Sequence, residues 1–212
     1  MLPLKVAYEP IPLARWGALF HVLVLERPDV RLEWLPATFP RRDRPLLDGA
    51  DVGLFLEPPD EPDLHSIPLG VSRMVVLMSV GHRLARNHEL RVADVLDEPF
   101  PDGAELHPEW RAFWTLDAYR GRPAPAPPID VTTAEQGLEA VAAGSAIATF
   151  PEMLADGLPH PGIISLPLVD GPAVTLRLIW RAGESHLGVL ALIDIARDMF
   201  DGGSPGPHLT LV

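Results

Sequence analysis

The chain of 212 residues has 17 basic and 29 acidic side chains, and its formal net charge of −12 opposes nonspecific binding to nucleic-acid phosphates. It contains no cysteine, which excludes disulfide bonds, thiolate metal sites and thiol catalysis within this sequence. No apolar stretch approaches the roughly 20 residues of a membrane span, and the first residues lack the pattern of a signal peptide. We therefore expect a cytoplasmic globular protein, built as one large domain or as two lobes, without membrane contact.

The first quarter of the chain alternates short apolar runs with helical periodicity. The expected elements are a strand at 4–8, a helix at 13–27, a strand at 30–36, a short helix at 45–48 and a strand at 52–56. Pro12 suits the first turn of the helix because its missing N–H would be unbonded there. This order predicts a parallel α/β sheet, in which ligands bind beyond the carboxyl ends of the strands, at residues 9–11 and 37–39.

A long apolar stretch at 64–85 has a counterpart near the C-terminus. A Pro-Leu step at Pro68 precedes the apolar run at 73–78, and a second step at Pro167 precedes the run at 174–180. In each half a glycine ends a helix before a short buried strand. We interpret the pattern as two similar α/β lobes that exchange strands, with the first run as the outward hinge strand and the second as the return.

The middle and end of the chain supply the elements of the second lobe and the return. We expect a short helix at 92–97, a strand at 98–101, a turn at 102–103, a helix at 108–119, a strand at 129–132, a helix from 132 to 144 and a final helix capped by Ser185. Trp110, Phe113 and Trp114 cluster on one side of the 108–119 helix, where core packing and a subunit contact both remain open.

Two registers of a capping box mark the start of the helix at 132. Thr132 can pair with Glu135, or Thr133 with Gln136. If the second lobe mirrors the first, the free amides at this helix start would face the cleft.

Motifs for enzymatic chemistry are absent from the sequence. Ser185 lies in a segment that resembles a nucleophile elbow, but the spacing is G-x-S-x-x-G and the segment precedes the last helix. The eight histidines show no ligand spacing, and no G-x-G-x-x-G or phosphate loop occurs. We expect no catalytic residues, no metal and no other cofactor.

Three segments, read in order, carry a family pattern. Residues 69–85 read LGVSRMVVLMSVGHRLA, residues 90–100 read LRVADVLDEPF, and residues 141–151 read VAAGSAIATFP. They resemble, in the same order, an apolar strand followed by H-P-L-A, the segment l-x-d-L-x-x-e-P-f and the segment V-a-a-G-x-G-i-a-l-l-P of the effector-binding domain of LysR-type transcriptional regulators. The resemblance covers roughly residues 4–200.

This resemblance implies an α/β fold of two Rossmann-like lobes joined by two crossing hinge strands, as in type 2 periplasmic binding proteins. The expected division is lobe I at 1–76, lobe II at 77–178, a return to lobe I at 179–200 and a flexible tail at 201–212.

Carried over by position, the resemblance also implies an effector pocket between the lobes. Its expected residues are Glu9, Pro10, Ile11, Leu13, Thr38, Arg41, Ser79, Asp102, Thr132, Thr133, Thr149 and Phe150. The chain departs from the family at Pro10-Ile11-Pro12, because family members often have Ser or Thr there; a hydroxyl and two backbone donors are lost. Polar anchoring is therefore expected from the helix start at 132–133 and from Arg41, between apolar walls.

The implied function is a sensor whose small-molecule effector, a carboxylate or an aromatic metabolite, controls a winged helix-turn-helix expected to precede this sequence. DNA would bind only through that domain, and the regulator would form a homodimer or tetramer. The helix at 13–27 of one subunit would pack against the helix at 108–119 of another, through Trp16, Trp110 and Trp114.

Two alternatives share the same fold. One is an extracytoplasmic solute-binding protein. The other is a dehydratase-type enzyme with Glu9 or Asp102 as the acid, although a solvated loop carboxylate and a turn-forming Asp are the ordinary roles of these residues.

Overall fold

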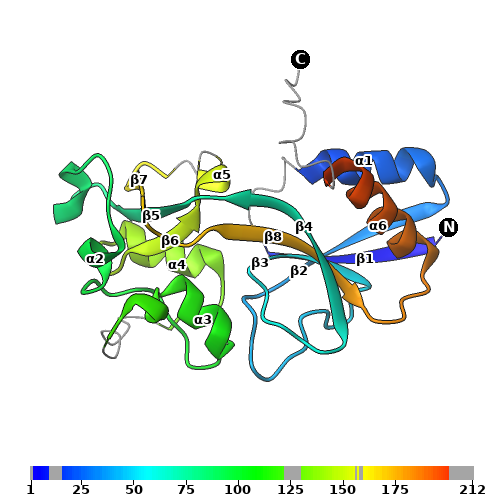
Figure 1. The fold of residues 1–212 in the computed structure, drawn as a ribbon, viewed down its shortest axis with the longest axis horizontal. Helices are drawn as coiled ribbons and strands as arrows, with labels where there is room; N and C mark the ends of the chain where they lie inside the picture. The colour runs from blue at the N-terminus through cyan, green and yellow to red at the C-terminus, as the bar shows by residue number, and fades with distance from the viewer. Residues whose placement is uncertain (1, 10–15, 122–129, 156, 158–159, 201–212) are drawn as a thin grey trace, which may run out of the picture.

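The computed structural model describes residues 2–9, 16–121, 130–155, 157 and 160–200, which form two α/β lobes side by side along the longest axis (Figure 1). Lobe I contains a five-stranded sheet in the order β2-β1-β3-β8-β4, and lobe II contains a three-stranded sheet in the order β6-β5-β7. The strand order shows that the chain crosses from lobe I to lobe II and later returns. The expected two-lobed architecture is confirmed.

Lobe I is built on a mixed sheet. Its strands are β1 (Leu2–Tyr8), β2 (Val30–Pro36), β3 (Val52–Leu56), β4 (Leu64–Ser72) and β8 (Val174–Arg181). β1 runs parallel to β2 and β3, whereas β8 runs antiparallel to β3 and β4. Every residue of β3 is buried, as expected of a central strand covered on both faces.

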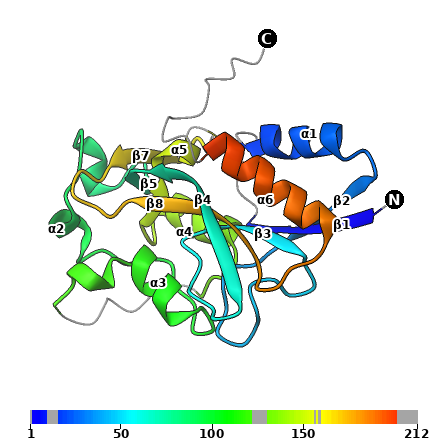
Figure 2. The same ribbon diagram turned by 45° about the vertical axis from the view of Figure 1, so that its right-hand side comes forward.

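Two helices cover one face of this sheet, α1 (Gly17–Glu26) and α6 (Leu187–Phe200), and they lie side by side in both views (Figures 1 and 2). Leu19 and Leu23 of α1 are fully buried at helical spacing, as are Val189 and Leu192 of α6. The expected helix at 13–27 is confirmed over its described part.

The crossing between the lobes occurs at Arg73. β4 ends at Ser72 in the lobe I sheet, and β5 (Met74–Ser79) begins at once as the central strand of the lobe II sheet. The chain returns between β7 (Ile163–Pro167) and β8. The strand pairing therefore places both changes of sheet a few residues before the expected boundaries at 76/77 and 178/179.

Lobe II surrounds its small sheet with short helices. Its elements are β5, β6 (Ala148–Pro151), β7, α2 (Val92–Val95), α3 (Pro108–Trp114), α4 (Ala134–Ala142), α5 (Glu152–Ala155) and the 3₁₀ helices η2 (Arg83–Arg86) and η3 (Asp117–Tyr119). β5 runs antiparallel to both neighbours, and all its residues except Ser79 are buried. The apolar run that suggested a hinge strand is thus the core of lobe II.

Four expected local structures are wrong. The helix expected at 45–48 is replaced by a turn at 46–49, in which Gly49 has a φ of +75°, because the segment is too short to bury a helical face. The strands expected at 98–101 and 129–132 are replaced, in the described residues, by one isolated bridge between Asp102 and Asp130. The helix expected at 108–119 breaks at Leu116, whose φ of 60° lies in the left-handed region.

Helix starts are only partly as expected. Thr133 caps α4 by accepting from the Gln136 backbone N–H at 3.4 Å, as the second register predicts. The reciprocal bond differs, because the Gln136 side chain accepts from the Thr132 N–H at 2.7 Å and not from the N–H of the capping residue. Ser185 does not cap α6; instead His186 Nδ1 accepts from the Gly188 N–H at 3.1 Å, because the helix begins one residue later than expected.

Candidate functional site

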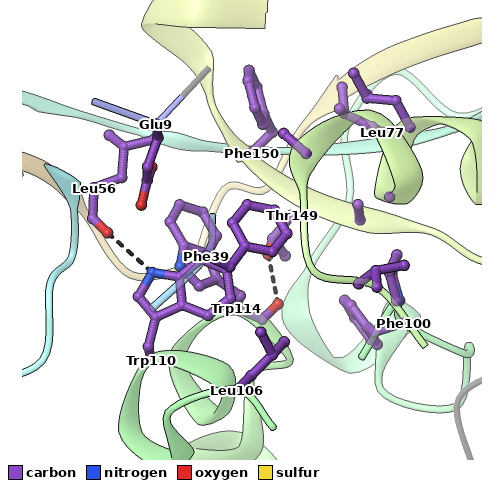
Figure 3. Close-up of a pocket in the computed structure, with 16 residues that line it drawn as sticks. Glu9, Phe39, Leu56, Leu77, Phe100, Leu106, Trp110, Trp114, Thr149 and Phe150 are labelled. Atoms are coloured by element: carbon purple, nitrogen blue, oxygen red, sulfur yellow. Dashed lines mark hydrogen bonds between the residues drawn. The ribbon is translucent and has the colours of Figure 1, made fainter. Parts of the chain in front are cut away.

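A cavity of about 100 Å³ lies where the two lobes meet (Figure 3). Its lining is mainly apolar and aromatic, and it consists of Glu9, Phe39, Leu56, Leu77, Phe100, Pro101, Leu106, Trp110, Trp114, Val131, Ala134, Gly137, Leu138, Ala148, Thr149 and Phe150. For scale, an engineered cavity of about 150 Å³ holds a benzene molecule. The volume and lining therefore suit a small organic ligand with an apolar body.

Lobe I contributes the carboxyl ends of three parallel strands. Glu9 follows β1, Phe39 lies beyond the end of β2, and Leu56 is the last residue of β3. Because β1 lies between the other two strands, these three residues reach the same edge of the sheet. The expectation that a ligand would lie beyond these strand ends agrees with the position of the cavity.

Lobe II contributes an aromatic wall from α3. Trp110 and Trp114 are four residues apart on one helical face, and their ring centroids are 5.9 Å apart. Phe39 of lobe I stacks on Trp110 at 4.6 Å between centroids, with the rings tilted by 38°. The sequence placed these tryptophans in a core or a subunit contact, whereas the structure makes them the wall of the cavity.

The remaining lobe II surface comes from β5, β6, the first half of α4 and the connecting segments that carry Phe100, Pro101, Leu106 and Val131. Thr149 lines the cavity, but its hydroxyl donates to the Trp114 carbonyl oxygen at 2.6 Å and so fixes the end of α3. Gly137 of α4 faces open space, since a Cβ built there would meet only Pro101 Cβ, at 4.0 Å. A larger side chain at Gly137 would therefore extend into the cavity.

Hydrogen bonds join the lobes around the cavity. The Trp110 indole N–H donates to the Leu56 carbonyl at 3.2 Å, and the Phe39 N–H donates to the Thr132 carbonyl at 3.0 Å. The His107 N–H also donates to the Pro40 carbonyl at 2.8 Å. These contacts stabilise an arrangement in which the lobes close over the cavity.

Glu9 is the one acidic side chain among the described residues of the cavity lining. It is only 2% exposed, and its Oε1 has no hydrogen-bonding partner within the described part of the chain. Burial raises the pKa of Glu9 to about 8 and outweighs a backbone hydrogen bond from Leu56, which lowers the pKa. The interpretation of Glu9 as a solvated loop carboxylate is therefore wrong, because the lobes enclose it.

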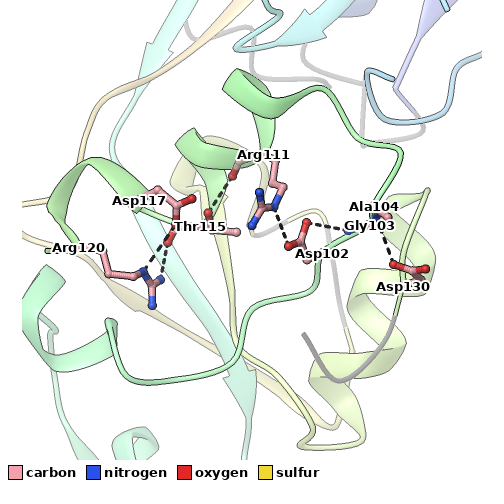
Figure 4. A network of polar contacts seen from close by, with 8 residues as sticks. All are labelled: Asp102, Gly103, Ala104, Arg111, Thr115, Asp117, Arg120 and Asp130. Carbon is pink, nitrogen blue, oxygen red and sulfur yellow. Dashed lines mark hydrogen bonds and ion pairs between the residues drawn. The ribbon is translucent and has the colours of Figure 1, made fainter. Parts of the chain in front are cut away.

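Asp102 lies next to the lining residue Pro101 but does not line the cavity. Its Oδ2 accepts from Arg111 Nε at 2.6 Å, and its Oδ1 accepts from the Gly103 N–H at 2.7 Å (Figure 4). Asp130 supports the same turn by accepting from the Ala104 N–H at 3.3 Å. Both oxygens of Asp102 are thus occupied, and the residue holds the turn that carries Pro101 and Leu106.

The other expected pocket residues are dispersed. Thr149 and Phe150 line the cavity together with Glu9. Thr132 and Thr133 form the adjacent cap of α4, and Ser79 accepts from the Gly81 N–H at the end of β5. Thr38 is exposed, and Arg41 pairs with Asp43 at 2.9 Å. The expected residues Pro10, Ile11 and Leu13 lie outside the described residues.

Sequence reasoning missed Leu56, Phe100, Leu106 and the two tryptophans of α3. The signal for the tryptophans was their four-residue spacing, which also fits a core face and therefore did not identify a cavity. Within the described ranges, no group of three or more His, Cys, Asp or Glu side chains is placed to hold a metal ion. None of the described helices has the length and apolarity needed to cross a membrane.

Two α/β lobes that exchange strands and close on a cavity define a ligand-binding domain of the periplasmic-binding-protein type. The family model of the LysR substrate binding domain matches residues 5–201, and the chain belongs to this family. A curated relative, the uncharacterized HTH-type transcriptional regulator YwbI of Bacillus subtilis (strain 168), is 29% identical over 142 residues. That match covers 63% of this chain and 45% of the relative, so the chain spans about half of its length.

Solved structures share the fold. The effector binding domain of a BenM variant matches with a TM-score of 0.75 and 17% identity, covering 98% of this chain and 100% of that one. The regulatory domain of CcmR from Synechocystis PCC6803, in complex with 2-PG, matches with a TM-score of 0.71 and 16% identity, covering 96% and 99%. The reduced OxyR regulatory domain from Pseudomonas aeruginosa matches with a TM-score of 0.65 and 21% identity, covering 92% of this chain and 97% of that one.

The family assignment does not favour the two alternatives, an extracytoplasmic solute-binding protein and a dehydratase-type enzyme. Asp102, one of the two acids considered for catalysis, uses both oxygens in structural hydrogen bonds.

Proposed function

We propose that the chain is the effector-sensing part of a cytoplasmic, non-enzymatic transcriptional regulator. The observation that supports this most directly is the cavity, to which both lobes of a LysR substrate binding domain contribute side chains. Among the structures with this fold, a BenM effector binding domain holds its effector benzoate, and full-length CbnR is in complex with its target DNA. We infer a winged helix-turn-helix in the parent protein as the part that binds DNA, since the net charge of this chain opposes that role.

The lobes would transmit the signal by changing their relative angle. The crossings at Arg73 and at 168–173 are the connections about which one lobe can turn relative to the other. A ligand that contacts Phe39 or Leu56 in lobe I and Trp110 in lobe II would favour one angle. It can shift the equilibrium only by the difference between its affinities for the two arrangements.

We propose that Glu9, Thr149 and Phe150 contact the effector, and that Thr132 and Thr133 act by holding α4 at the cavity. Contacts from Pro10, Ile11, Leu13, Thr38, Arg41, Ser79 and Asp102 remain predictions.

A thermal-shift screen of small carboxylates, aromatic compounds and amines tests the function. A ligand at about 100 times its Kd adds about 2.7 kcal/mol, which corresponds to a melting shift of about 5–10 °C in a domain of this size. Gly137→Met should abolish the shift by filling the cavity, while Gly17→Met adds the same side chain at an exposed position with no atom within 4 Å. Equal shifts in both variants would place binding elsewhere.

We further propose that the regulator forms a homodimer or tetramer, but not through Trp16 or Trp110, two of the three tryptophans first considered. Trp16 is 4% exposed and packs on Gly70, where a Cβ would come within 2.8 Å of its ring, and Trp110 is 6% exposed inside its own subunit. Val24 and Leu25 on α1 are the better candidates, because they are 42% and 68% exposed. Leu25→Glu should lower the sedimentation coefficient if α1 forms the contact, and an unchanged oligomer would exclude it.

A further inference from the structure

One buried group in the cavity lacks a partner. Glu9 Oε1 has no hydrogen bond within the described residues, although the side chain is almost completely buried. The carboxyl group points toward the rings of Phe39 and Trp110 (Figure 3). A buried polar group without a partner is costly, so a ligand that supplies one gains affinity at this position.

The surfaces around that carboxyl group are aromatic. Phe39, Trp110 and Trp114 form a continuous group of rings, with centroid separations of 4.6 and 5.9 Å between neighbours. Aromatic faces attract cations through the ring quadrupole, and the attraction strengthens where water is excluded. The indole N–H of Trp114, which also lines the cavity, is a second buried polar atom without a partner among the described residues.

The charges around the cavity favour a cation over an anion. None of the described lining residues is Lys, Arg or His, and Glu9 is the only ionisable group among them. Among the charged residues next to the lining in sequence, Glu57 adjoins Leu56 and adds a negative charge. Asp102 adjoins Pro101, but its charge is balanced by the ion pair with Arg111. The formal net charge of −12 adds a long-range field that attracts cations.

We propose that the cavity binds an organic amine in its protonated, cationic form. The ammonium group would pair with the Glu9 carboxylate, and an aromatic or compact apolar body would pack against Phe39, Trp110 and Trp114. The inference rests on the proposed function and names the chemical class of its effector. The sequence led us to expect a carboxylate or an aromatic metabolite as the effector. Of these two classes we keep the aromatic one and add a positive charge.

The pairing links binding to pH. Burial raises the pKa of Glu9 to about 8, so Glu9 is mostly protonated in the free protein at pH 7. A bound ammonium favours the carboxylate, and binding at pH 7 should therefore release most of one proton. Affinity should rise about tenfold from pH 6 to pH 7, level off near pH 8 and fall again where the amine itself loses its proton.

Isothermal titration calorimetry with three compounds of the same ring tests the proposal. Benzylamine is cationic, benzyl alcohol is its neutral counterpart, and benzoate is anionic. At pH 8 we expect benzylamine to bind at least tenfold more tightly than benzyl alcohol, and benzoate to bind most weakly. Titrations at pH 7 in two buffers of different ionisation enthalpy should show the released proton.

Glu9→Gln provides the matching variant, because glutamine mimics the protonated acid and should fold. It should lower benzylamine affinity at least tenfold and leave benzyl alcohol affinity unchanged. Glu109→Gln removes the same charge at an exposed position beside Trp110 and should change neither affinity. A melting curve for each variant confirms that it is folded.

The outcomes separate the proposal from the function on which it rests. Benzyl alcohol or benzoate binding that Gly137→Met blocks would show that the cavity is the effector site. If benzylamine then binds no more tightly than these compounds, the assignment of a cationic ligand is overturned while the effector site stands. An unchanged benzylamine affinity in Glu9→Gln would also overturn it. Failure of all three compounds to bind overturns the assignment, and failure of the wider thermal-shift screen would then contradict the site itself.

Discussion

Glu9 in lobe I and Asp102 in lobe II are both buried acids beside the same cavity, yet their surroundings differ. Asp102 is 9% exposed and has the Arg111 guanidinium and the Gly103 N–H as partners. Glu9 is 2% exposed, and one of its oxygens has no partner in the described structure. The comparison shows that burial alone does not identify a ligand-binding acid; a buried acid becomes a candidate when the protein leaves its hydrogen-bonding capacity unused.

The largest expected effect is on the pH dependence of stability. The pKa of Glu9 is raised from 4.5 to about 8, so the folded protein keeps a proton that the unfolded chain loses. Stability should therefore fall as pH rises from 4.5 to about 8 and then level off. Glu9→Gln should remove this fall, making the variant more stable than the wild type by about 3–5 kcal/mol at pH 9 and similar to it at pH 4.5.

Urea unfolding at several pH values measures this difference. Glu109→Gln serves as the control, because Glu109 is exposed on α3 and precedes Trp110 in the sequence. Parallel pH profiles of Glu9→Gln and the wild type would show that burial does not raise the pKa of Glu9.

A loss of stability is expected at Asp102, the acid with two partners. Asp102→Ala should destabilise the protein by about 2 kcal/mol, since it removes two hydrogen bonds, one of them to a charged group. Thermal unfolding measures the loss. Unlike Glu9→Gln, the variant should show this loss at both pH 6 and pH 9; a loss confined to one of these values would break the contrast between the two acids.

A smaller effect is expected where the lobes meet. Trp110→Phe keeps a ring in the cavity wall but removes the hydrogen bond to the Leu56 carbonyl, so we expect a loss of about 1 kcal/mol. Small-angle scattering should show a larger radius of gyration as the population of open lobes increases. An unchanged scattering curve would mean that this bond does not control closure.

The sequence predicted much of the lobe architecture. The Pro-Leu steps at Pro68 and Pro167 and the apolar runs after them indicated two strand exchanges, which the sheets confirm. The run at 73–78 was interpreted as a hinge, but burial on both faces suits a central strand equally well, and the pattern could not distinguish these roles.

The candidate site was less predictable. A parallel sheet places ligands at strand ends, and this rule led to Glu9 and to the neighbourhood of Phe39. The enclosure of Glu9 depends on lobe II lying over lobe I, which local sequence does not encode. The same holds for Trp110, whose helical spacing fits a core face and whose role as a wall depends on the closed arrangement.

The most direct measurement is the titration of the Glu9 side-chain carboxyl carbon by ¹³C NMR, with and without benzylamine. We expect a pKa near 8 in the free protein and a lower value in the presence of the amine, because the ammonium stabilises the carboxylate. A pKa near the ordinary 4.5, or a raised pKa that benzylamine leaves unchanged, would contradict the claim that Glu9 is a buried, unpartnered acid that pairs with a cationic ligand.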